Sequence, residues 1–194
     1  MSEFIYHLDL QLLKFINNSL SNDFFDTVLP VLRQKTTWLP LYLLVIYLIY
    51  RKYGLKSLWV IGFAILTVVL CDQISAGVIK PYFKRFRPFD NPEIANWLNT
   101  PIGKGSGWSF VSSHATNHFG MAIYFSMVLV GYKDQWKYYV PFIAWAFLIA
   151  FSQVYLAFHY PSDVLAGALL GITIGYATAR LNCLVICVRS DKKI

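Results

Sequence analysis

The chain has 194 residues and a formal net charge of +7; 57% of its residues are hydrophobic and only 14% are charged. This composition is too apolar for a water-soluble domain, and it supplies enough apolar sequence for several membrane spans of about 20 residues each. The basic residues are dispersed over loops and predicted helix ends, so we expect no nucleic-acid partner. No repeat, low-complexity tract or linker divides the chain, which predicts one domain over residues 1–194.

Residues 1–35 form an amphipathic segment that precedes the predicted transmembrane core of residues 36–194. Apolar side chains recur along one side of a helix, at Phe4, Ile5, Leu8, Leu12, Phe15 and Ile16. More or less opposite them lie Glu3, Asp9, Lys14 and Asn17. The pattern predicts a helix on the membrane surface, with a buried packing helix as the alternative. Asn22 or Asp23 is expected to cap a second short helix that runs through Leu32.

Five apolar segments follow, at residues 38–53, 57–79, 114–131, 138–158 and 162–188. The first is short, because extending it backward would bury the charges of Arg33 and Lys35. Tyr132, Trp136 and Tyr138 lie at a turn between two spans, as interfacial aromatic residues do. The expected architecture is therefore an all-α polytopic transmembrane bundle of about five spans, with amphipathic interfacial helices at its N-terminus.

The charge of the loops predicts the orientation in the membrane. One side carries Arg51, Lys52, Lys56, Lys133, Lys137, Arg189, Lys192 and Lys193. The other side carries Lys80, Lys84, Arg85, Arg87 and Lys104, plus Arg33 and Lys35. The two sides carry nearly equal numbers of basic residues. When the cations of the candidate site described below are left out, the first side is the more basic one and is assigned to the cytoplasm. We therefore expect an integral inner (cytoplasmic) membrane protein whose site faces the periplasm or the cell exterior.

Metal and cofactor sites are not predicted. His114 and His118 have the i, i+4 spacing of a zinc pair, but no Glu lies between them and no third ligand is evident. We expect His118 to form a hydrogen bond with a neighbouring helix instead. The three cysteines all fall within predicted spans, where a free Cys is commonly a small apolar residue, so no disulfide is expected.

Three polar clusters are predicted on one side of the membrane. They are Lys80 with Arg87-Pro88, Ser112-Ser113-His114, and Ser152-Gln153 with His159 and Asp163. Together they supply two cations, a hydroxyl-rich turn and two histidines, which is an inventory for phosphoryl transfer. An imidazole held by a carboxylate keeps one ring nitrogen unprotonated and able to attack phosphorus. Taken singly, such residues are more often interfacial anchors or packing residues, so the prediction rests on the combination.

The local sequence indicates how two of these clusters are built. Pro161 suits the first position of a helix, so Asp163 falls in the first turn and can reach back toward His159, as in a capping box. Ser112 precedes an apolar helical run and suits an N-cap, beyond which free backbone N–H groups bind anions.

The geometry of the first cluster stays open. An unbroken helix would place Lys80 and Arg87 on one face, because they are nearly two turns apart. Pro81 argues against this arrangement, since it lacks a hydrogen-bond donor and disfavours the helical conformation at Lys80.

The order and spacing of the clusters resemble the three signatures of the type-2 phosphatidic acid phosphatase superfamily. The second signature is usually Pro-Ser-Gly-His, and the third is usually Ser-Arg, five residues, His, three residues and Asp. The resemblance extends from about residue 38 to residue 188. It implies that His159 is the nucleophile that forms a phosphohistidine, Asp163 its partner and His114 the general acid. The implied phosphate-binding residues are Lys80, Arg87, Ser112, Ser113 and Gln153.

Gln153 is the main departure from this pattern, because the resemblance implies Arg at its position. Arg makes a charged, forked contact with phosphate, whereas Gln offers only a neutral amide. We expect either a weakened site or compensation by Lys84, Arg85 or Lys104. Without such compensation, Gln153→Arg should raise catalytic efficiency about tenfold.

The resemblance implies metal-independent hydrolysis of a lipid phosphate or diphosphate, with the bilayer and the lipid as partners. Undecaprenyl diphosphate is the first-choice substrate, which would connect the chain to cell-wall synthesis. Phosphatidylglycerophosphate, phosphatidic acid and lipid A 1-phosphate are the alternatives. A non-catalytic lipid-phosphate binder or transporter is the alternative of another class, and Gln153 motivates it.

Overall fold

The computed structural model describes residues 3–131 and 136–191, and every regular element in this part of the chain is a helix. The N-terminal helices are α1 (Glu3–Lys14) and α2 (Asp23–Arg33). They precede α3 (Leu39–Tyr53), α4 (Ser57–Asp72), α5 (Lys80–Phe83), α6 (Ser113–Phe125), α7 (Val140–Tyr155) and α8 (Pro161–Asp191). Short π or 3-10 segments continue or join them at Phe15–Ser19, Lys35–Trp38, Gly54–Lys56, Gln73–Ile79, Pro88–Asp90, Ala95–Trp97, Ser126–Val130 and Trp136–Tyr138. The all-α prediction is confirmed.

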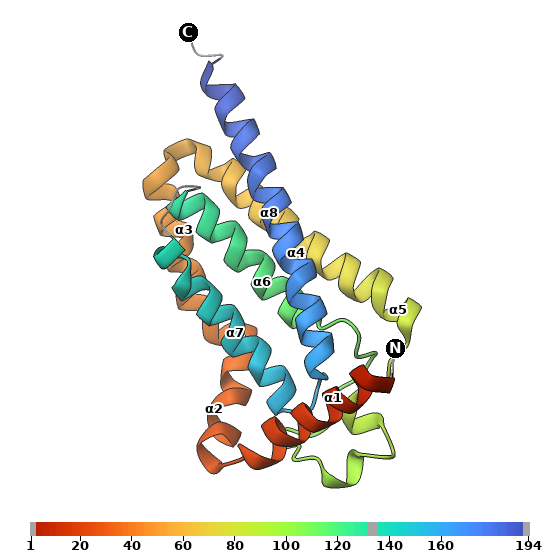
Figure 1. Ribbon diagram of the computed structural model, residues 1–194. Helices are drawn as coiled ribbons and strands as arrows, with labels where there is room; N and C mark the ends of the chain where they lie inside the picture. Colours follow the sequence, from red (N-terminus) through yellow and green to blue (C-terminus); the bar gives the residue numbers. More distant parts are fainter. Residues whose placement is uncertain (1–2, 132–135, 192–194) are drawn as a thin grey trace.

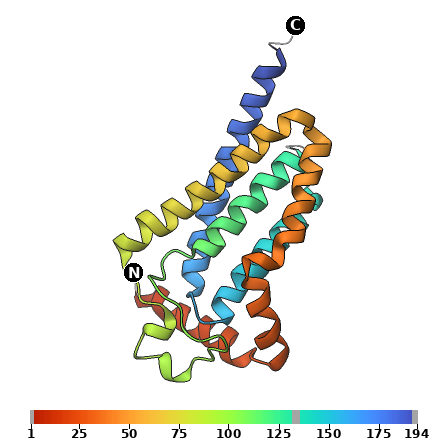
Figure 2. The same cartoon turned by 180° about the vertical axis from the view of Figure 1, so that it is seen from behind.

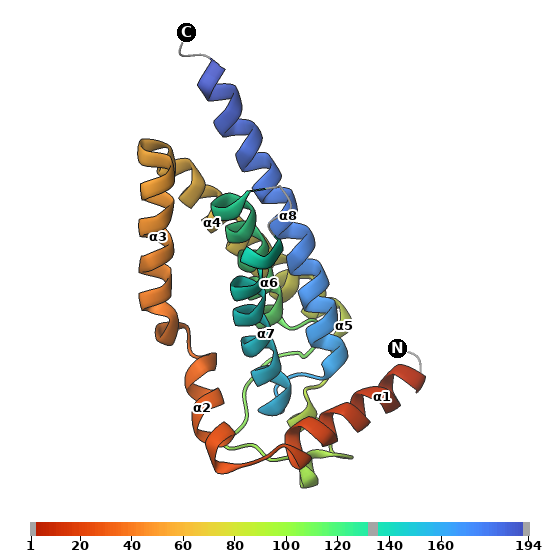
Figure 3. The ribbon, with the colours of Figure 1, turned by 60° about the vertical axis from the view of Figure 1, so that its left-hand side comes forward.

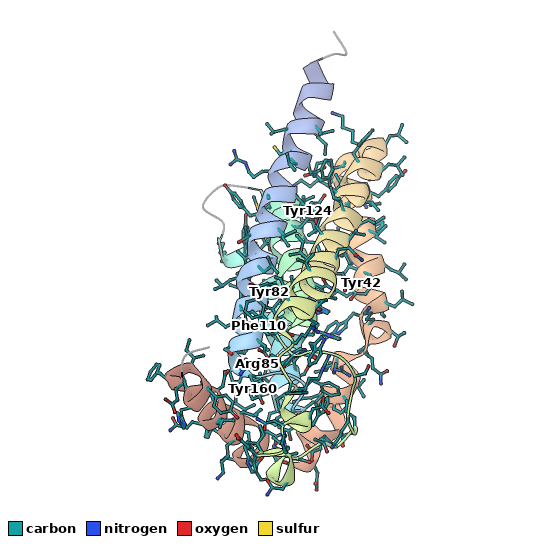
Figure 4. All side chains as sticks on the ribbon, turned by 90° about the vertical axis from the view of Figure 1, so that its right-hand side faces the viewer. Tyr42, Tyr82, Arg85, Phe110, Tyr124 and Tyr160 are labelled. Carbon is teal, nitrogen blue, oxygen red and sulfur yellow. The ribbon has the colours of Figure 1, made fainter. Side chains whose placement is uncertain are left out.

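The long helices run up and down past one another, and α8 is the longest of them (Figure 1). α6 lies against α4, α7 and α8. Tyr124 of α6 is fully buried in the apolar core, and its hydroxyl donates to the backbone oxygen of Val60 in α4 (Figure 4). The α3–α4 turn lies at one end of the bundle, whereas α1, the loop of residues 84–112 and the α7–α8 turn lie at the other end (Figures 1 and 2). The loops that carry the predicted clusters thus meet at one end.

The five predicted segments correspond to α3, α4 with its continuation to Ile79, α6 with its continuation to Val130, α7 and α8. Two helical stretches are long and apolar enough to cross a membrane by length and composition, Lys35–Asp90 and Pro161–Ile186, and α7 is apolar but shorter. The first stretch includes both α3 and α4. Tyr132, Lys133, Lys192 and Lys193, which support the span and orientation predictions, lie outside the described residues.

α1 is amphipathic as predicted, but the side that faces the protein carries both Asp9 and the apolar Leu13. Asp9 and Asn17 are only 2% and 0% exposed, whereas Phe4 is 76% exposed. Asn17 donates to the backbone oxygens of Asn99 and Tyr155, which joins the N-terminal segment to the long loop and to the end of α7. The segment therefore combines both alternatives, because it packs on the protein through Asp9, Asn17 and the apolar Leu13 and turns the apolar side around Phe4 outward.

The geometry that the sequence left open is settled here: Lys80 is helical although it precedes Pro81, and the helix soon ends. The segment before it, Gln73–Ile79, is π-helical, a widened turn of the kind that accommodates a missing donor. Lys84 then adopts a left-handed conformation with φ of 46° and ends α5, and Arg87 is extended. Lys80 and Arg87 therefore do not share one helical face.

α6 and α8 approach closely through glycines. Gly167, Gly171 and Gly175 recur every four residues on α8 and face α6, and small residues at this spacing let helix backbones touch. A methyl group at Gly171 would lie 2.2 Å from the backbone oxygen of Thr116. This contact fixes the starts of α6 and α8 relative to each other.

We expect Gly171→Ala to destabilise the protein by about 2–3 kcal/mol, because neither backbone can yield to the added methyl group. In detergent, the thermal unfolding midpoint should fall by roughly 5–10 °C. Gly62→Ala is the matched control, because a methyl group there meets nothing within 4 Å. An unchanged midpoint for Gly171→Ala would show that the two helices are held by other contacts.

Candidate active site

The three predicted clusters converge at the end of the bundle that α1 crosses. Lys80 interacts electrostatically with Arg87 and Asp163, and both cations interact with His159. His114 interacts electrostatically with His159 as well. The backbone N–H of Ser112, at the start of α6, donates to the backbone oxygen of Asp163 at 3.0 Å and joins the second cluster to the third.

His159 follows directly on the end of α7. The N–H of Phe158 donates to the oxygen of Gln153, and the N–H of Ala157 donates to the oxygen of Val154. Ala157 has a φ of 59°, so the helix ends in the left-handed turn that usually contains Gly. His159 also donates its own backbone N–H to the oxygen of Gln153 at 3.1 Å. The turn thereby fixes the imidazole, which is only 1% exposed.

Asp163 is held from several sides. Its Oδ2 accepts hydrogen bonds from the backbone N–H of Tyr160 at 2.9 Å and from the hydroxyl of Ser109 at 2.5 Å. The bond from Tyr160 is the predicted capping-box contact. Oδ1 pairs with the guanidinium of Arg85. His159 Nδ1 lies 3.7 Å from Oδ2, so the carboxylate does face the imidazole.

Ser109 lies between these two groups and sets the tautomer of the histidine. Its Oγ is 3.4 Å from His159 Nδ1. Because the Asp163 carboxylate only accepts, Ser109 donates its proton to Asp163 and can accept one from Nδ1. The other ring nitrogen, Nε2, then carries the free electron pair. Burial lowers the pKa of the His159 imidazole to about 4, with Asp163 acting in the opposite direction, so the ring is neutral at pH 7.

Arg85 braces Asp163, whereas the sequence suggested it as a substitute for the missing arginine. Its Nη2 pairs with Asp9 of α1 at 2.7 Å, and its guanidinium lies 3.9 Å from the centre of the Tyr160 ring (Figure 4). Asp9 also accepts from the backbone N–H of Ser162 and so caps α8. Arg85 is thus fully engaged with protein groups.

Gln153 is completely buried and forms hydrogen bonds with protein groups. Its Nε2 donates to the hydroxyl of Ser152 at 3.2 Å, and its Oε1 accepts from Nε of Arg33 at 3.3 Å. The expected compensation by Lys84 or Lys104 is not formed, because both side chains are exposed and neither contacts Gln153 in the described structure. Arg33, at the end of α2, is the cation at this position.

Ser112 caps α6 as predicted, because its hydroxyl accepts from the backbone N–H of Ala115. The hydroxyl of Ser113 accepts from Ser75 at 2.9 Å. The expected hydrogen bond from His118 to a neighbouring helix is not formed among the described residues. Its Nδ1 lies 2.7 Å from the backbone oxygen of His114, one turn earlier in α6, and its ring packs edge-on against Trp145 of α7. Because this backbone oxygen lies one helical turn away, Nδ1 of His118 can form its hydrogen bond within α6 itself.

The roles of Asp9, Arg33, Arg85 and Ser109 do not follow from the sequence. The helical pattern places Asp9 on the polar side of a surface helix, Arg33 is only a charge that limits a span, and Ser109 lies in a loop without a pattern. A weak signal was available for Asp9 alone, because it lies directly between Leu8 and Leu10 and a buried carboxylate needs a partner.

Comparisons with known proteins identify the family. Residues 55–183 match the model of the PAP2 superfamily. The chain belongs to this superfamily. The expected family is thereby confirmed, and the chain is a PAP2-family phosphatase. The matched region begins after α3, so it does not contain Asp9 or Arg33.

Curated relatives of this PAP2 phosphatase are lipid phosphatases. A lipid A 4'-phosphatase of Bacteroides thetaiotaomicron is 33% identical over 176 residues, which cover 88% of this chain and 75% of the relative. A lipid A 4'-phosphatase of Porphyromonas gingivalis is 27% identical, with 82% of this chain and 66% of the relative covered. Undecaprenyl-diphosphatase BcrC of Bacillus subtilis is 30% identical over 57% of this chain and 54% of its own length.

Two solved structures share the fold. The transmembrane PAP2-type phosphatidylglycerolphosphate phosphatase of Bacillus subtilis has a TM-score of 0.70 and 19% identity, with 93% of this chain and 87% of that chain covered. Aquifex aeolicus LpxE has a TM-score of 0.65 and 24% identity, with 89% and 95% covered.

Proposed function

We propose that this PAP2 phosphatase hydrolyses the phosphate ester of a membrane lipid through a phosphohistidine on His159. The observation that carries the proposal is the juxtaposition of a neutral, buried imidazole, oriented by Ser109 and Asp163, with the cations Lys80 and Arg87. A phosphoryl group in transfer spreads negative charge over its equatorial oxygens, and fixed cations stabilise that charge. Ser112, and the free backbone N–H groups around Ser113 at the start of α6, add hydrogen-bond donors.

The reaction has two steps in this proposal. His159 Nε2 attacks phosphorus; a P–N bond forms, the P–O bond to the lipid breaks, and His114 protonates the leaving oxygen. His114 then accepts a proton from water as the water attacks the phosphohistidine, which breaks the P–N bond and releases inorganic phosphate. Ser109, which is held by Asp163, keeps the Nδ1 proton of His159 in place through both steps.

Lipid A 4'-phosphate is the first candidate substrate, because two lipid A 4'-phosphatases are similar to the chain over more than four fifths of its length. Undecaprenyl diphosphate, the first choice from sequence, becomes the second candidate. Its support is the similarity to undecaprenyl-diphosphatases of Bacillus subtilis and Sulfolobus acidocaldarius over 57% and 75% of this chain.

We also propose that α3, α4, α6, α7 and α8 cross the inner membrane, with the site at the periplasmic or outer surface. Large apolar side chains on the outside of α3, α4 and α8 support this arrangement, among them Leu43, Leu58, Ile65, Leu165 and Leu169. In that orientation, α1 lies along the surface with its apolar side toward the lipid. A lipid phosphate would then reach the site with its tail still in the bilayer.

Phosphate release from a panel of lipids tests the proposal. The purified protein should hydrolyse lipid A 4'-phosphate with higher kcat/KM than undecaprenyl diphosphate, lipid A 1-phosphate, phosphatidylglycerophosphate or phosphatidic acid. A preference for the diphosphate would return undecaprenyl diphosphate to first place. Release from none of them would favour the non-catalytic binder.

Activity should persist in EDTA, because protein cations supply the positive charge that phosphoryl transfer needs. Orthovanadate should inhibit, because it forms a five-coordinate adduct at a nucleophile of this kind. The measurement is initial rate with and without chelator. Loss of activity in EDTA with recovery on adding Mg²⁺ would contradict the proposed mechanism.

A further inference from the structure

Arg33 lies beside the nucleophile although it is 126 positions away in the chain. Its guanidinium carbon is 3.8 Å from the centre of the Phe158 ring, and Phe158 immediately precedes His159. The guanidinium of Arg87 lies 5.6 Å from the same ring centre, and its Nη1 donates to the backbone oxygen of Phe158. The two arginines thus share one aromatic ring next to His159.

Among the described residues, neither cation forms an ion pair with a carboxylate, although Asp90 and Asp163 act electrostatically on Arg87. The ion pairs of the described residues involve Arg85 and His159, and none includes Arg33. Arg33 and Arg87 repel each other, and Arg33 also acts electrostatically on His114. Two partly buried cations at close range are unfavourable unless an anion joins them. The chemical class that fits is a phosphate group bound between the two guanidinium groups.

Gln153 directs the Arg33 side chain. A guanidinium only donates, so the amide oxygen must face Nε of Arg33, while the amide nitrogen turns back to Ser152 and to the oxygen of Ile149. No hydrogen bond joins the Nη groups of Arg33 to a protein acceptor in the part of the chain that is described. These groups remain available for the forked contact that arginine makes with phosphate oxygens.

α2 is fastened in the position that this contact needs. The hydroxyl of Tyr155 donates to Asp26 of α2 at 2.7 Å, only two residues after Gln153 on α7. At the other end of α2, the indole of Trp38 donates to the backbone oxygen of Leu32, beside Arg33, at 2.7 Å. Figure 3 shows α2 between α1 and the start of α3, at the site end of the bundle.

We infer that Arg33 is a phosphate-binding residue that replaces the arginine missing at position 153, and that Gln153 is the residue that positions it. The inference rests on the proposed function for its substrate, a lipid phosphate. It reverses the expectation for Gln153→Arg: a third guanidinium beside Arg33 and Arg87 adds repulsion and removes the oxygen that Arg33 contacts.

An exchange of the two side chains tests the inference. The variants are Arg33→Gln, Gln153→Arg and the double variant, with Arg33→Lys to retain charge without the fork and Arg51→Gln as the control. Arg51 contacts Tyr47 at the opposite end of the bundle. The readouts are kcat/KM on the preferred lipid phosphate, the inhibition constant of orthovanadate, and the Kd of inorganic phosphate by calorimetry.

Arg33→Gln should lower kcat/KM 10- to 100-fold and weaken vanadate and phosphate binding by a similar factor. The kcat/KM of Arg33→Lys should lie between those of Arg33→Gln and the wild type. Gln153→Arg alone should lower kcat/KM about tenfold. The kcat/KM of the double variant should be at least tenfold higher than that of Arg33→Gln. Arg51→Gln should have the same kcat/KM and phosphate affinity as the wild type.

Equal phosphate affinity in wild type and Arg33→Gln would overturn the inference, and so would a double variant no better than Arg33→Gln. The measurements of phosphate binding separate this inference from the proposed function. If phosphate binding depends on Arg33 but no lipid phosphate is hydrolysed, the proposed function fails and the role of Arg33 stands.

Discussion

Replacement of His159 by alanine is expected to lower phosphatase activity by roughly 10⁴-fold or more and to abolish any phosphoenzyme, because the nucleophile is removed. Binding of inorganic phosphate should persist, since Lys80, Arg87 and Arg33 remain. His7 on α1 is exposed and provides a matched control, so His7→Ala should retain full activity. Activity of His159→Ala within tenfold of the wild type would mean that another group, or water itself, attacks phosphorus.

His114 should behave differently from His159, because a general acid matters less when the leaving group is good. The kcat/KM of His114→Ala on a lipid monophosphate should be about 10²- to 10⁴-fold lower than that of the wild type, because the leaving oxygen is an alkoxide. On a lipid diphosphate the loss should be smaller, because the leaving group is a phosphate. Equal losses on the two substrates, measured as kcat/KM, would contradict the assignment of His114 as the acid.

Arg85→Ala is expected to have the largest effect on stability. The side chains of Asp163 and Asp9 are only 0% and 3% exposed, and the change would leave both carboxylates without their cation. Removing one partner of a buried ion pair costs about 3–5 kcal/mol. Activity should fall as well, because Asp163 would no longer be held in its orientation toward His159.

Asp9→Asn combined with Arg85→Ala provides the control for this prediction. The double variant removes one of the two orphaned charges, so its thermal unfolding midpoint in detergent should lie above that of Arg85→Ala alone. Normal stability of Arg85→Ala with lost activity and weak phosphate binding would show that Arg85 contacts the substrate. The bracing role would then be wrong.

Contacts between residues close in the chain could be predicted from the sequence. The helix that starts at Pro161, the reach of Asp163 to the backbone of Tyr160 and the cap at Ser112 follow from rules that span a single turn. The apolar segments also predicted the long helices, because membrane spans need length and hydrophobicity alone.

Contacts between distant residues could not be predicted in this way. Arg33 and Gln153 are 120 positions apart, and Asp9 and Arg85 are 76 positions apart. The apolar stripe of α1 predicted an amphipathic helix, but it did not indicate that Asp9 and Leu13 would be the buried residues, because Asp9 is paired with Arg85 far away in the chain. No local rule indicates which side of a membrane-surface helix contacts the protein.

The substrate could not be predicted for a related reason. The three signatures contain the residues expected to contact the phosphate, so they carry no information about the rest of the lipid. The preference among lipid A, undecaprenyl and glycerol lipids depends on the surfaces that meet the lipid tail and headgroup. The proposal of lipid A 4'-phosphate therefore rests on the extent of the similarity, which covers 88% of this chain for the Bacteroides relative and 57% for BcrC.

Trapping the phosphoenzyme tests the central proposal most directly. Wild-type protein and His159→Ala would be mixed with ³²P-labelled lipid phosphate, quenched in alkali within milliseconds, and mapped by peptide mass spectrometry. We expect an alkali-stable, acid-labile label on His159 in the wild type and no label in the variant. Label on another residue, or rapid turnover with no covalent label at any quench time, would contradict the phosphohistidine mechanism.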